Sequence, residues 1–451
     1  MSTRFVNVDR NSPMLMATDM RSWVPEDDMV HFVLEAVEAV PLTDFRVNER
    51  GTGSAQYPPR MLLALLIYCY ANGIFGSRRI ERATYRDIAV RYLTADTHPD
   101  HDTICKFRRE NFAAVSTAFL SVLKLAHELK LLKVGTVSID GTHIKANASK
   151  HHALSYARAC ELEQQLQLEI AALMTRAESA DSSSDEDGQK LPDELSRCEA
   201  LRRKVTEARQ KLERRAAARA EAEQAEYERK VREREARAKN RGGRRPKPPD
   251  PTPAPDEQVN MTDEDSRIMR SNKGGEYRQA YNSQATVGAD GSQLILSANV
   301  TNCASDAAEL LPGVQGVPAE LGRPNAVLAD TGYTHADVFE TLREFGVEPY
   351  VPPSRQAAGQ RRSHDFRPGR KTTEKRITDP RLKQMRAKLD TDTGRALYAK
   401  RKQTVEPVFG IIKEAMGFRQ FLLRGLEKVR GEWRLVCLAY NVRRLFVLRT
   451  P

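Results

Sequence analysis

The sequence predicts a mixed α/β sheet flanked by helices, with an all-α N-terminal region and an inserted charged helical hairpin. Between residues 134 and 351, strand-like and helical patterns follow the order strand, hairpin, helix, strand, helix, strand, which is typical of a mixed sheet. Residues 27–132 carry successive helical patterns instead. Residues 153–240 carry charge-rich helical stripes with little apolar content, so they look inserted into the sheet.

Length, charge and cysteine content limit the class of protein. The chain has 451 residues, which suggests two or three domains, and its net charge of +11 favours a polyanionic partner, either nucleic acid or an anionic membrane surface. Its longest apolar run, residues 61–71, reads as a buried helix and the N-terminus lacks the apolar core of a signal peptide, so a membrane is the weaker interpretation. The six cysteines form no C-x-x-C pair, which argues against structural zinc and fits a reducing cytoplasm.

The N-terminal region is predicted to be a set of short helices that read DNA. Short helices with a tight connection and arginines on one face suit a helix-turn-helix-like reader. Lys106, Arg108 and Arg109 are the candidate phosphate or base contacts, although an ordinary bundle with solvated arginines explains the local sequence equally well. Helical patterns span residues 27–40, 58–72, 77–93, 102–111 and 112–132.

The first strand is predicted between residue 134 and Asp140. Val134, Val137 and Ile139 are β-branched and Asp140-Gly141 follows directly, so the strand is expected to end there in a turn. Without context, an aspartate in this position is more often a turn former than a reactive group.

The inserted segment is predicted to be a two-helix hairpin with a linker. Apolar residues at helical spacing lie on both sides of a flexible acidic connector at residues 179–188, and the stripe dissolves after Leu212. A proline-rich basic linker begins at Arg241. The segment contributes charge and reach but no chemistry that its sequence identifies.

The sheet is predicted to resume at residue 281. Strands at 281–288 and 293–301 form a hairpin around Asp290-Gly291, and a helix begins at Asp306. A short apolar strand then ends in Asp330. The remaining helix and strand are predicted at residues 335–345 and 347–351.

A strongly basic stretch precedes the last carboxylate of interest. Residues 353–403 hold 16 Lys/Arg against 5 Asp/Glu, with Arg370-Lys371 among several basic pairs, which is the strongest polyanion signal in the chain. A disordered basic loop without a specific target is the alternative, and it is compatible with DNA binding. Glu406 follows on an amphipathic helix whose apolar face holds Val408, Phe409, Ile412 and Met416.

Asp140, Asp330 and Glu406 are the candidate catalytic residues. Reactive groups in an α/β sheet gather where strands end and helices begin. Three carboxylates that converge there need a compensating charge to stay ionised. A pair of Mg²⁺ ions supplies it, and two metals about 3.5–4 Å apart stabilise the entering and leaving oxygens of a displacement at phosphorus.

Taken in this order, the motifs resemble bacterial insertion-sequence transposases of the DDE type, whose catalytic domain has the ribonuclease H-like fold. The resemblance covers most of the chain apart from the insertion. It implies a helical DNA-binding domain at 1–132, a split catalytic domain at 133–152 and 261–451, and an inserted hairpin with its Pro-rich linker at 153–260. It rests on residues 139–147, 263–269, 281–285, 328–333, 405–413, 417–421 and 424–425, and on the helical region 58–111.

The resemblance also implies roles for single residues. Asp140, Asp330 and Glu406 would be the metal ligands, with Mg²⁺ expected and Mn²⁺ able to substitute. Lys413, seven residues after Glu406, matches a family lysine that points at DNA phosphate. Relatives often place a tyrosine and an arginine shortly before the glutamate. Here Tyr398 precedes Glu406 by eight residues, and either Arg401 or Lys402 fills the phosphate-clamping role.

The implied activity is DNA transposition. A metal-activated water would release a 3′-hydroxyl at the element end, and that hydroxyl would attack target DNA without a covalent protein intermediate. The expected partners are the element's terminal inverted repeats, target DNA and a second copy of the chain, because two ends must be brought together. The expected location is the cytoplasm, at the nucleoid. The alternatives are a nuclease of the same fold without strand transfer, and a domesticated DNA-binding protein, which ranks last because all three carboxylates are present.

Overall fold

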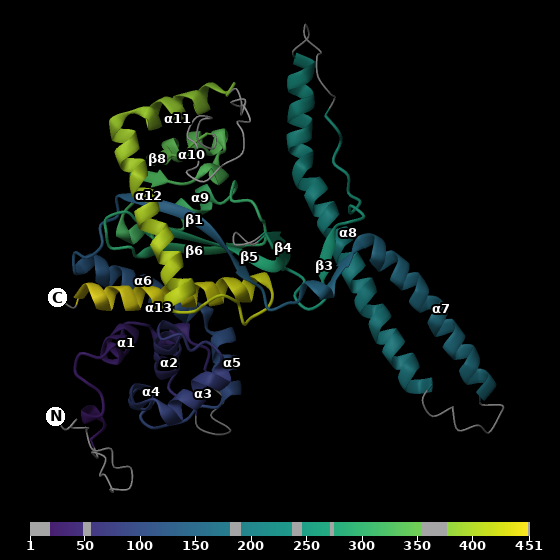
Figure 1. Ribbon diagram of the computed structural model, residues 1–451, viewed down its shortest axis with the longest axis horizontal. Coiled ribbons are helices and arrows are strands. Elements are labelled where there is room, and N and C mark those ends of the chain that lie inside the picture. Colours follow the sequence, from purple (N-terminus) through teal and green to yellow (C-terminus); the bar gives the residue numbers. More distant parts are fainter. Residues whose placement is uncertain are drawn as a thin grey trace, which may run out of the picture.

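The protein consists of a body built on one large sheet and a long helical hairpin at its side (Figure 1). The computed structural model describes residues 19–47, 56–180, 191–236, 246–270, 275–353 and 377–449. None of the helices in these ranges is long and apolar enough to cross a membrane.

The N-terminal region is helical, as predicted. Its central helix, α2, is buried on every side from Leu62 to Ala71 and packs against α1 and the C-terminal helix α13. Asp87 divides the predicted helix at residues 77–93, because its side chain accepts the N–H of Val90 and starts a new helix. The helices are η1 (Met20–Ser22), α1 (Met29–Glu38), η2 (Leu42–Asp44), α2 (Pro59–Ala71), α3 (Ser77–Arg86), α4 (Ile88–Leu93), α5 (His101–Glu110) and α6 (Phe112–Glu128).

The sheet has the ribonuclease H-like arrangement. Strand β1 lies at its centre, antiparallel to β5 and parallel to β7, and β8 continues the parallel side. On the far side of β5, strands β6 and β4 pair with successive parts of its length. The strands are β1 (Thr136–Lys145), β4 (Arg267–Arg270), β5 (Tyr277–Gly288), β6 (Ile295–Thr301), β7 (Ala326–Leu328) and β8 (Glu348–Tyr350).

One strand boundary differs from the prediction. Strand β1 does not end at Asp140 but continues through Gly141 to Lys145, paired with β5 throughout. A Cβ at position 141 would overlap polar side-chain atoms of Gln284, Asp306 and Asn282. The glycine is therefore needed for close packing inside a strand, and the prediction of a turn was wrong.

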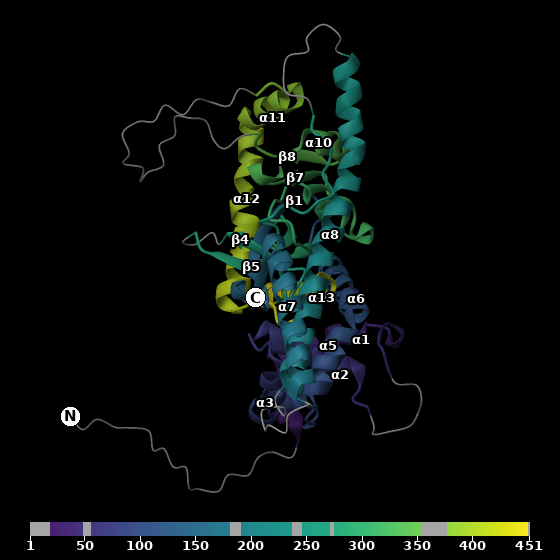
Figure 2. The same cartoon turned by 90° about the vertical axis from the view of Figure 1, so that its right-hand side faces the viewer.

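Helices pack against the sheet, and one of them also packs against the N-terminal region. Helix α12 contacts β1 and β5 and lies on one side of β1, β7 and β8 in Figure 2. Helix α13 passes between the sheet and the N-terminal helices, where it contacts β6, α2 and α6 (Figure 1). These elements are α9 (Leu310–Gln315), η5 (Ala319–Leu321), η6 (Thr331–Tyr333), α10 (Ala336–Glu344), α11 (Pro380–Asp390), α12 (Asp392–Gly410), the π-helical turn η7 (Ile411–Ala415) and α13 (Leu426–Arg449).

A buried polar relay joins α13 to the N-terminal helices. Glu432 accepts the backbone N–H groups of Leu422 and Leu423, at 3.0 and 2.9 Å, and the hydroxyl of Tyr70 at 3.2 Å. The Tyr70 oxygen accepts in turn from Arg108 at 2.8 Å. Burial raises the pKa of Glu432, and the Arg108 guanidinium opposes that shift. The relay therefore places one cation and one carboxyl group in the core between the two regions.

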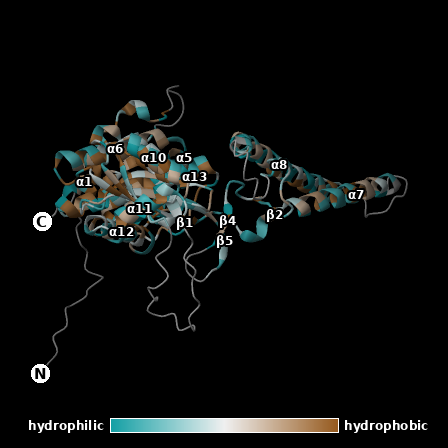
Figure 3. Cartoon of the chain, turned by 90° about the horizontal axis from the view of Figure 1, so that it is seen from above, coloured by the Kyte–Doolittle hydropathy of each residue, from teal (hydrophilic) through white to brown (hydrophobic). Residues whose placement is uncertain are grey.

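The inserted segment forms the predicted two-helix hairpin, with α7 (Tyr156–Ala180) and α8 (Leu191–Ala236). Seen from above in Figure 3, it extends away from the body, and hydrophilic residues alternate with hydrophobic ones along its two helices. At its base, η3 (Lys150–His152), β2 (Ala153–Ser155) and β3 (Gln258–Asn260) lead the chain in and out, and β2 pairs with β3. Its small core is separate from that of the body and holds Leu154, Ala159, Leu166, Val205, Ala208, Leu212 and Val259.

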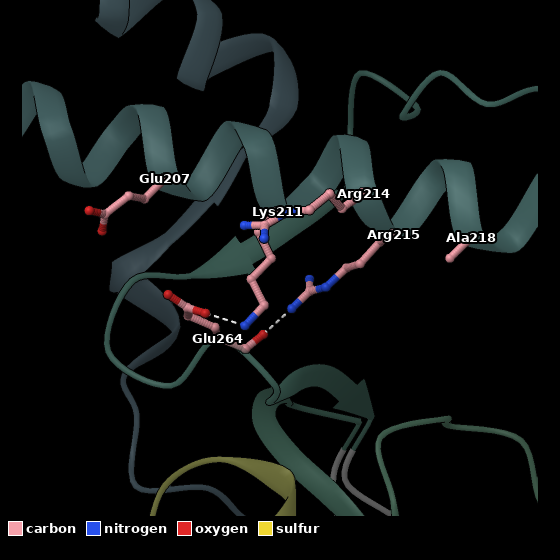
Figure 4. A pocket seen from close by; sticks show the side chains of 6 residues that line it. All are labelled: Glu207, Lys211, Arg214, Arg215, Ala218 and Glu264. Atoms are coloured by element: carbon pink, nitrogen blue, oxygen red, sulfur yellow. Dashed lines mark hydrogen bonds and ion pairs between the residues drawn. The ribbon is translucent and has the colours of Figure 1, made fainter.

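Charged contacts attach α8 to the body. Lys211 binds the carboxylate of Glu264, and Arg215 donates to the backbone oxygen of the same residue (Figure 4). Arg219 pairs at 3.2 Å with Glu257, which directly precedes β3 at the base of the hairpin. A hollow of about 500 Å³ lies here, lined by Glu207, Lys211, Arg214, Arg215, Ala218 and Glu264. Two of the cations in this hollow thus contact the body, which makes it an attachment point.

Candidate active site

The sheet register brings Asp140 and Asp330 to the same place. Ser138 of β1 pairs with Leu328 of the parallel strand β7, and each aspartate lies two residues further along its strand direction. Asp330 follows the end of β7 and starts η6, where its Oδ1 accepts the N–H of Gly332 at 2.7 Å. The two side chains therefore belong to adjacent strands at one edge of the parallel pair.

Glu406 reaches this edge from α12, and Arg401 lies between the carboxylates. Nη1 of Arg401 is 3.6 Å from Oδ2 of Asp140, and its Nη2 is 3.4 Å from Oε1 of Glu406. The Arg401 side chain is 13% exposed, whereas that of Lys402 is exposed. Tyr398, one turn earlier, hydrogen-bonds to Arg401. Arg401 thus contacts two of the three predicted carboxylates, and the third, Asp330, lies next to Asp140 on the adjacent strand.

The surroundings of Asp140 disfavour its ionised form. Burial raises the pKa of Asp140 to about 7. The Arg401 guanidinium opposes this shift, while the negative charges of Asp330 and Asp306 add to it. Asp140 is therefore a buried carboxyl group that holds its proton far more tightly than an ordinary aspartate.

Sequence reasoning missed Asp306, which lies within this cluster. Its Oδ1 accepts from Nδ2 of Asn282 and from Nε2 of Gln284, each at 2.7 Å. Gln284 is in turn the acceptor for the Tyr333 hydroxyl, on the turn that begins at Asp330. Asp306 lies between a strand and a helix, as Asp330 does, but the sequence pattern around it predicts only the start of a helix.

The predicted DNA contacts fall into different environments. Lys413 donates to Thr142 of β1 and so lies beside the carboxylates. Lys106 and Arg109 are exposed on α5, as a DNA contact requires. Arg108 is 4% exposed and hydrogen-bonds to Tyr70 and to the backbone oxygen of Phe75, so its prediction as a surface contact was wrong. Arg370 and Lys371 lie outside the described residues.

Two family matches identify the chain. Residues 249–442 match the transposase DDE domain, and residues 18–110 match the transposase domain DUF772. The chain belongs to the DDE transposases. No curated protein and no solved structure matches it.

The family matches include only two of the three predicted catalytic residues of this transposase. The DDE domain match includes Asp330 and Glu406, but neither match includes Asp140, which precedes the inserted hairpin. Asp140 is linked to the other two by geometry, through β1, β7 and Arg401. DNA is the partner that the transposase family implies, and the family is generally dependent on a divalent metal.

The site fits a divalent cation by its donor chemistry. Hard cations such as Mg²⁺ prefer carboxylate oxygens. Arg401 contacts Asp140 and Glu406 here, and the charges of Asp330 and Asp306 act on Asp140. Over the ranges that the structure describes, no three Asp, Glu, His or Cys side chains are close enough to hold a metal as they stand. Arg401 occupies the space between Asp140 and Glu406, so Arg401 has to move before both carboxylates bind one ion.

Proposed function

We propose that this transposase cleaves DNA at the ends of its element and joins the released 3′ ends to target DNA. Asp140, Asp330 and Glu406 would hold Mg²⁺, or Mn²⁺ in its place. The observation that supports this most directly is that Asp140 and Asp330 lie on adjacent strands while Arg401 of α12 contacts both Asp140 and Glu406. When bound, the cations supply positive charge that stabilises the oxygens entering and leaving phosphorus.

The protein's own groups position the reacting phosphate. Asp140 and Asp330 are held by paired strands, so their separation is fixed by the sheet. Arg401 pairs with Asp140 and Glu406 here, and a cation that neutralises both would release its guanidinium to clamp the phosphate with two N–H donors. Arg401, being largely buried at the carboxylates, suits this role better than the exposed Lys402. Lys413 would bind a second phosphate oxygen.

Two displacements at phosphorus complete the reaction. In the first, water attacks the phosphodiester at the element end, and the bond to the 3′ oxygen breaks to leave a 3′-hydroxyl. In the second, that hydroxyl attacks a phosphodiester of the target and displaces its 3′ oxygen. Each step exchanges one P–O bond for another, so the chain needs no covalent intermediate.

The three parts of the chain would divide the work. We infer that residues 1–132 bind the element ends, with Lys106 and Arg109 on phosphates, and that residues 133–152 and 261–451 carry the chemistry. The basic stretch around Arg370-Lys371 would hold DNA over α12. Because two ends must meet, the working species would be a homodimer on DNA.

The test compares single carboxylate variants on an element-end duplex. Asp140→Asn, Asp330→Asn and Glu406→Gln are each expected to abolish cleavage while leaving duplex binding intact. Glu340→Gln, which makes the same charge change on α10, is expected to cleave normally. Retained cleavage in a variant removes that residue from the site. A strand-transfer assay with pre-cleaved ends separates a transposase, which joins them, from a nuclease, which does not.

A further inference from the structure

Asp306 lies between the glycines that follow the two catalytic aspartates. A Cβ at Gly141 would overlap Oδ1 of Asp306, and a Cβ at Gly332 would lie 3.4 Å from its Oδ2. The same point at Gly332 is 2.9 Å from Oδ1 of Asp330. The carboxylate of Asp306 therefore fills the space between β1 and the turn at Asp330.

The two oxygens of Asp306 have different surroundings. Oδ1 accepts from the amides of Asn282 and Gln284, and Nε2 of Gln284 is also 3.0 Å from Oδ1 of Asn282. These amides project from β5, the strand that pairs with β1, so their positions are as fixed as the sheet. Within the part of the chain that the structure describes, no hydrogen bond reaches Oδ2, which faces the side of Asp330.

Local structure does not account for this carboxylate. The N-cap of α9 is Glu309, whose backbone N–H donates to the backbone oxygen of Asp306 and not to its carboxylate. The carboxylate of Asp306 thus caps no helix end. Neutral amides alone would not favour a third negative charge next to Asp140 and Asp330, so a carboxylate in this place indicates a cationic partner.

We propose that Asp306 is a fourth carboxylate ligand of the divalent-cation site. Asn282 and Gln284 hold Oδ1, and Oδ2 binds the cation that Asp330 binds. The inference rests on the proposed function, because it assigns one more ligand to the same site. It also explains why Gly141 and Gly332 flank the position: larger residues would displace the carboxylate from the cation.

The experiment measures Mn²⁺ binding to the full-length protein without DNA, from the electron paramagnetic resonance signal of the free ion. Asp306→Asn keeps an oxygen for the two amides and removes only the charge. It is expected to weaken Mn²⁺ affinity by about tenfold or more, as losing a metal-site group does. Asp330→Asn is expected to weaken it at least as much. Glu309→Gln changes a nearby carboxylate that bonds Asn299 instead, and is expected to bind Mn²⁺ like the wild type.

The outcomes separate the two proposals. Wild-type affinity in Asp306→Asn, together with loss in Asp330→Asn, overturns the role of Asp306 and leaves the proposed function standing. Unchanged affinity in both variants, or no binding by the wild type, counts against both. If Asp306→Asn does not fold, Fe²⁺-directed oxidative cleavage of the wild-type chain replaces it. Backbone cuts near residues 140, 330 and 306 are then expected, and cuts at the first two without the third contradict the proposal.

Discussion

The site and the inserted hairpin hold their charged groups in opposite ways. At the site, the largely buried charges of Asp140 on β1 and Arg401 on α12 meet, and each depends on chain segments far apart in the sequence. Along α8, many charges are partly exposed and paired locally or to a neighbouring loop. A charge in the first setting is costly to leave unpaired, whereas one in the second is already solvated. Substitutions should therefore have large, specific effects at the site and small effects on the hairpin.

The largest effect is expected at Gly141. Gly141→Ala places a Cβ against Gln284, Asp306 and Asn282, so we expect it to abolish cleavage and to lower the free energy of unfolding by about 3 kcal/mol. Gly135→Ala is the matched control, because a Cβ there meets no atom within 4 Å, and its effect should stay within about 0.5 kcal/mol. Cleavage assays and urea unfolding measure both. Equal effects at the two glycines would contradict the close packing at position 141.

The next largest effect distinguishes the roles of two neighbouring basic residues in cleavage. Arg401→Ala removes the guanidinium that contacts Asp140 and Glu406, and we expect cleavage to fall about 100-fold. Lys402→Ala removes an exposed charge beside it and should change the rate only a few-fold at most. Single-turnover cleavage at saturating protein measures the difference. A larger loss in Lys402→Ala would reassign the phosphate clamp.

The third effect is a pH dependence of stability in metal-free protein. The pKa of Asp140 is raised to about 7 in the folded chain, above its ordinary value of 3.8. Asp140 therefore binds its proton more tightly in the folded chain than in the unfolded chain. Its contribution to the free energy of unfolding is fully present below pH 3.8 and is lost as the pH rises through 7. Asp140→Asn avoids that loss, so at pH 8.5 it should be more stable than the wild type by up to about 4 kcal/mol.

Unfolding in the presence of a chelator, at pH 4 and pH 8.5, checks this expectation. The two proteins should be nearly equal in stability at the lower pH. A stability difference that does not change with pH would show that Asp140 is not the group responsible.

The smallest effect is expected on the hairpin. Arg219→Ala removes an ion pair with Glu257 that is partly exposed to solvent, so thermal unfolding should show a loss below about 1 kcal/mol. Cleavage should be unchanged. A loss as large as that of Gly141→Ala would mean that α8 stabilises the body far more than its surface contacts suggest.

The same contrast explains what the sequence could predict. Patterns that extend over about 20 residues or fewer predict the hairpin helices and the order of the strands, and the structure confirms both. The same kind of local pattern places Asp330 after a strand and Glu406 on a helix, where the structure also has them. Arg108 was misassigned because its burial depends on Glu432, in a helix at the other end of the chain. Asp306 was missed because it becomes notable only with Asn282, Gln284 and the glycines of two further segments around it.

The relay of Arg108, Tyr70 and Glu432 has a consequence for how such chains evolve. Arg108 and Tyr70 lie in the segment that matches one transposase domain, and Glu432 lies in the segment that matches the other. An exchange with a relative that lacks its part of the relay would leave a charge buried in the core without its counterpart, which destabilises a protein by about 3–5 kcal/mol. The two segments should therefore be exchanged together rather than separately. Recombination that alters which DNA ends the chain recognises should preserve these three residues, even where the surface of the N-terminal helices diverges.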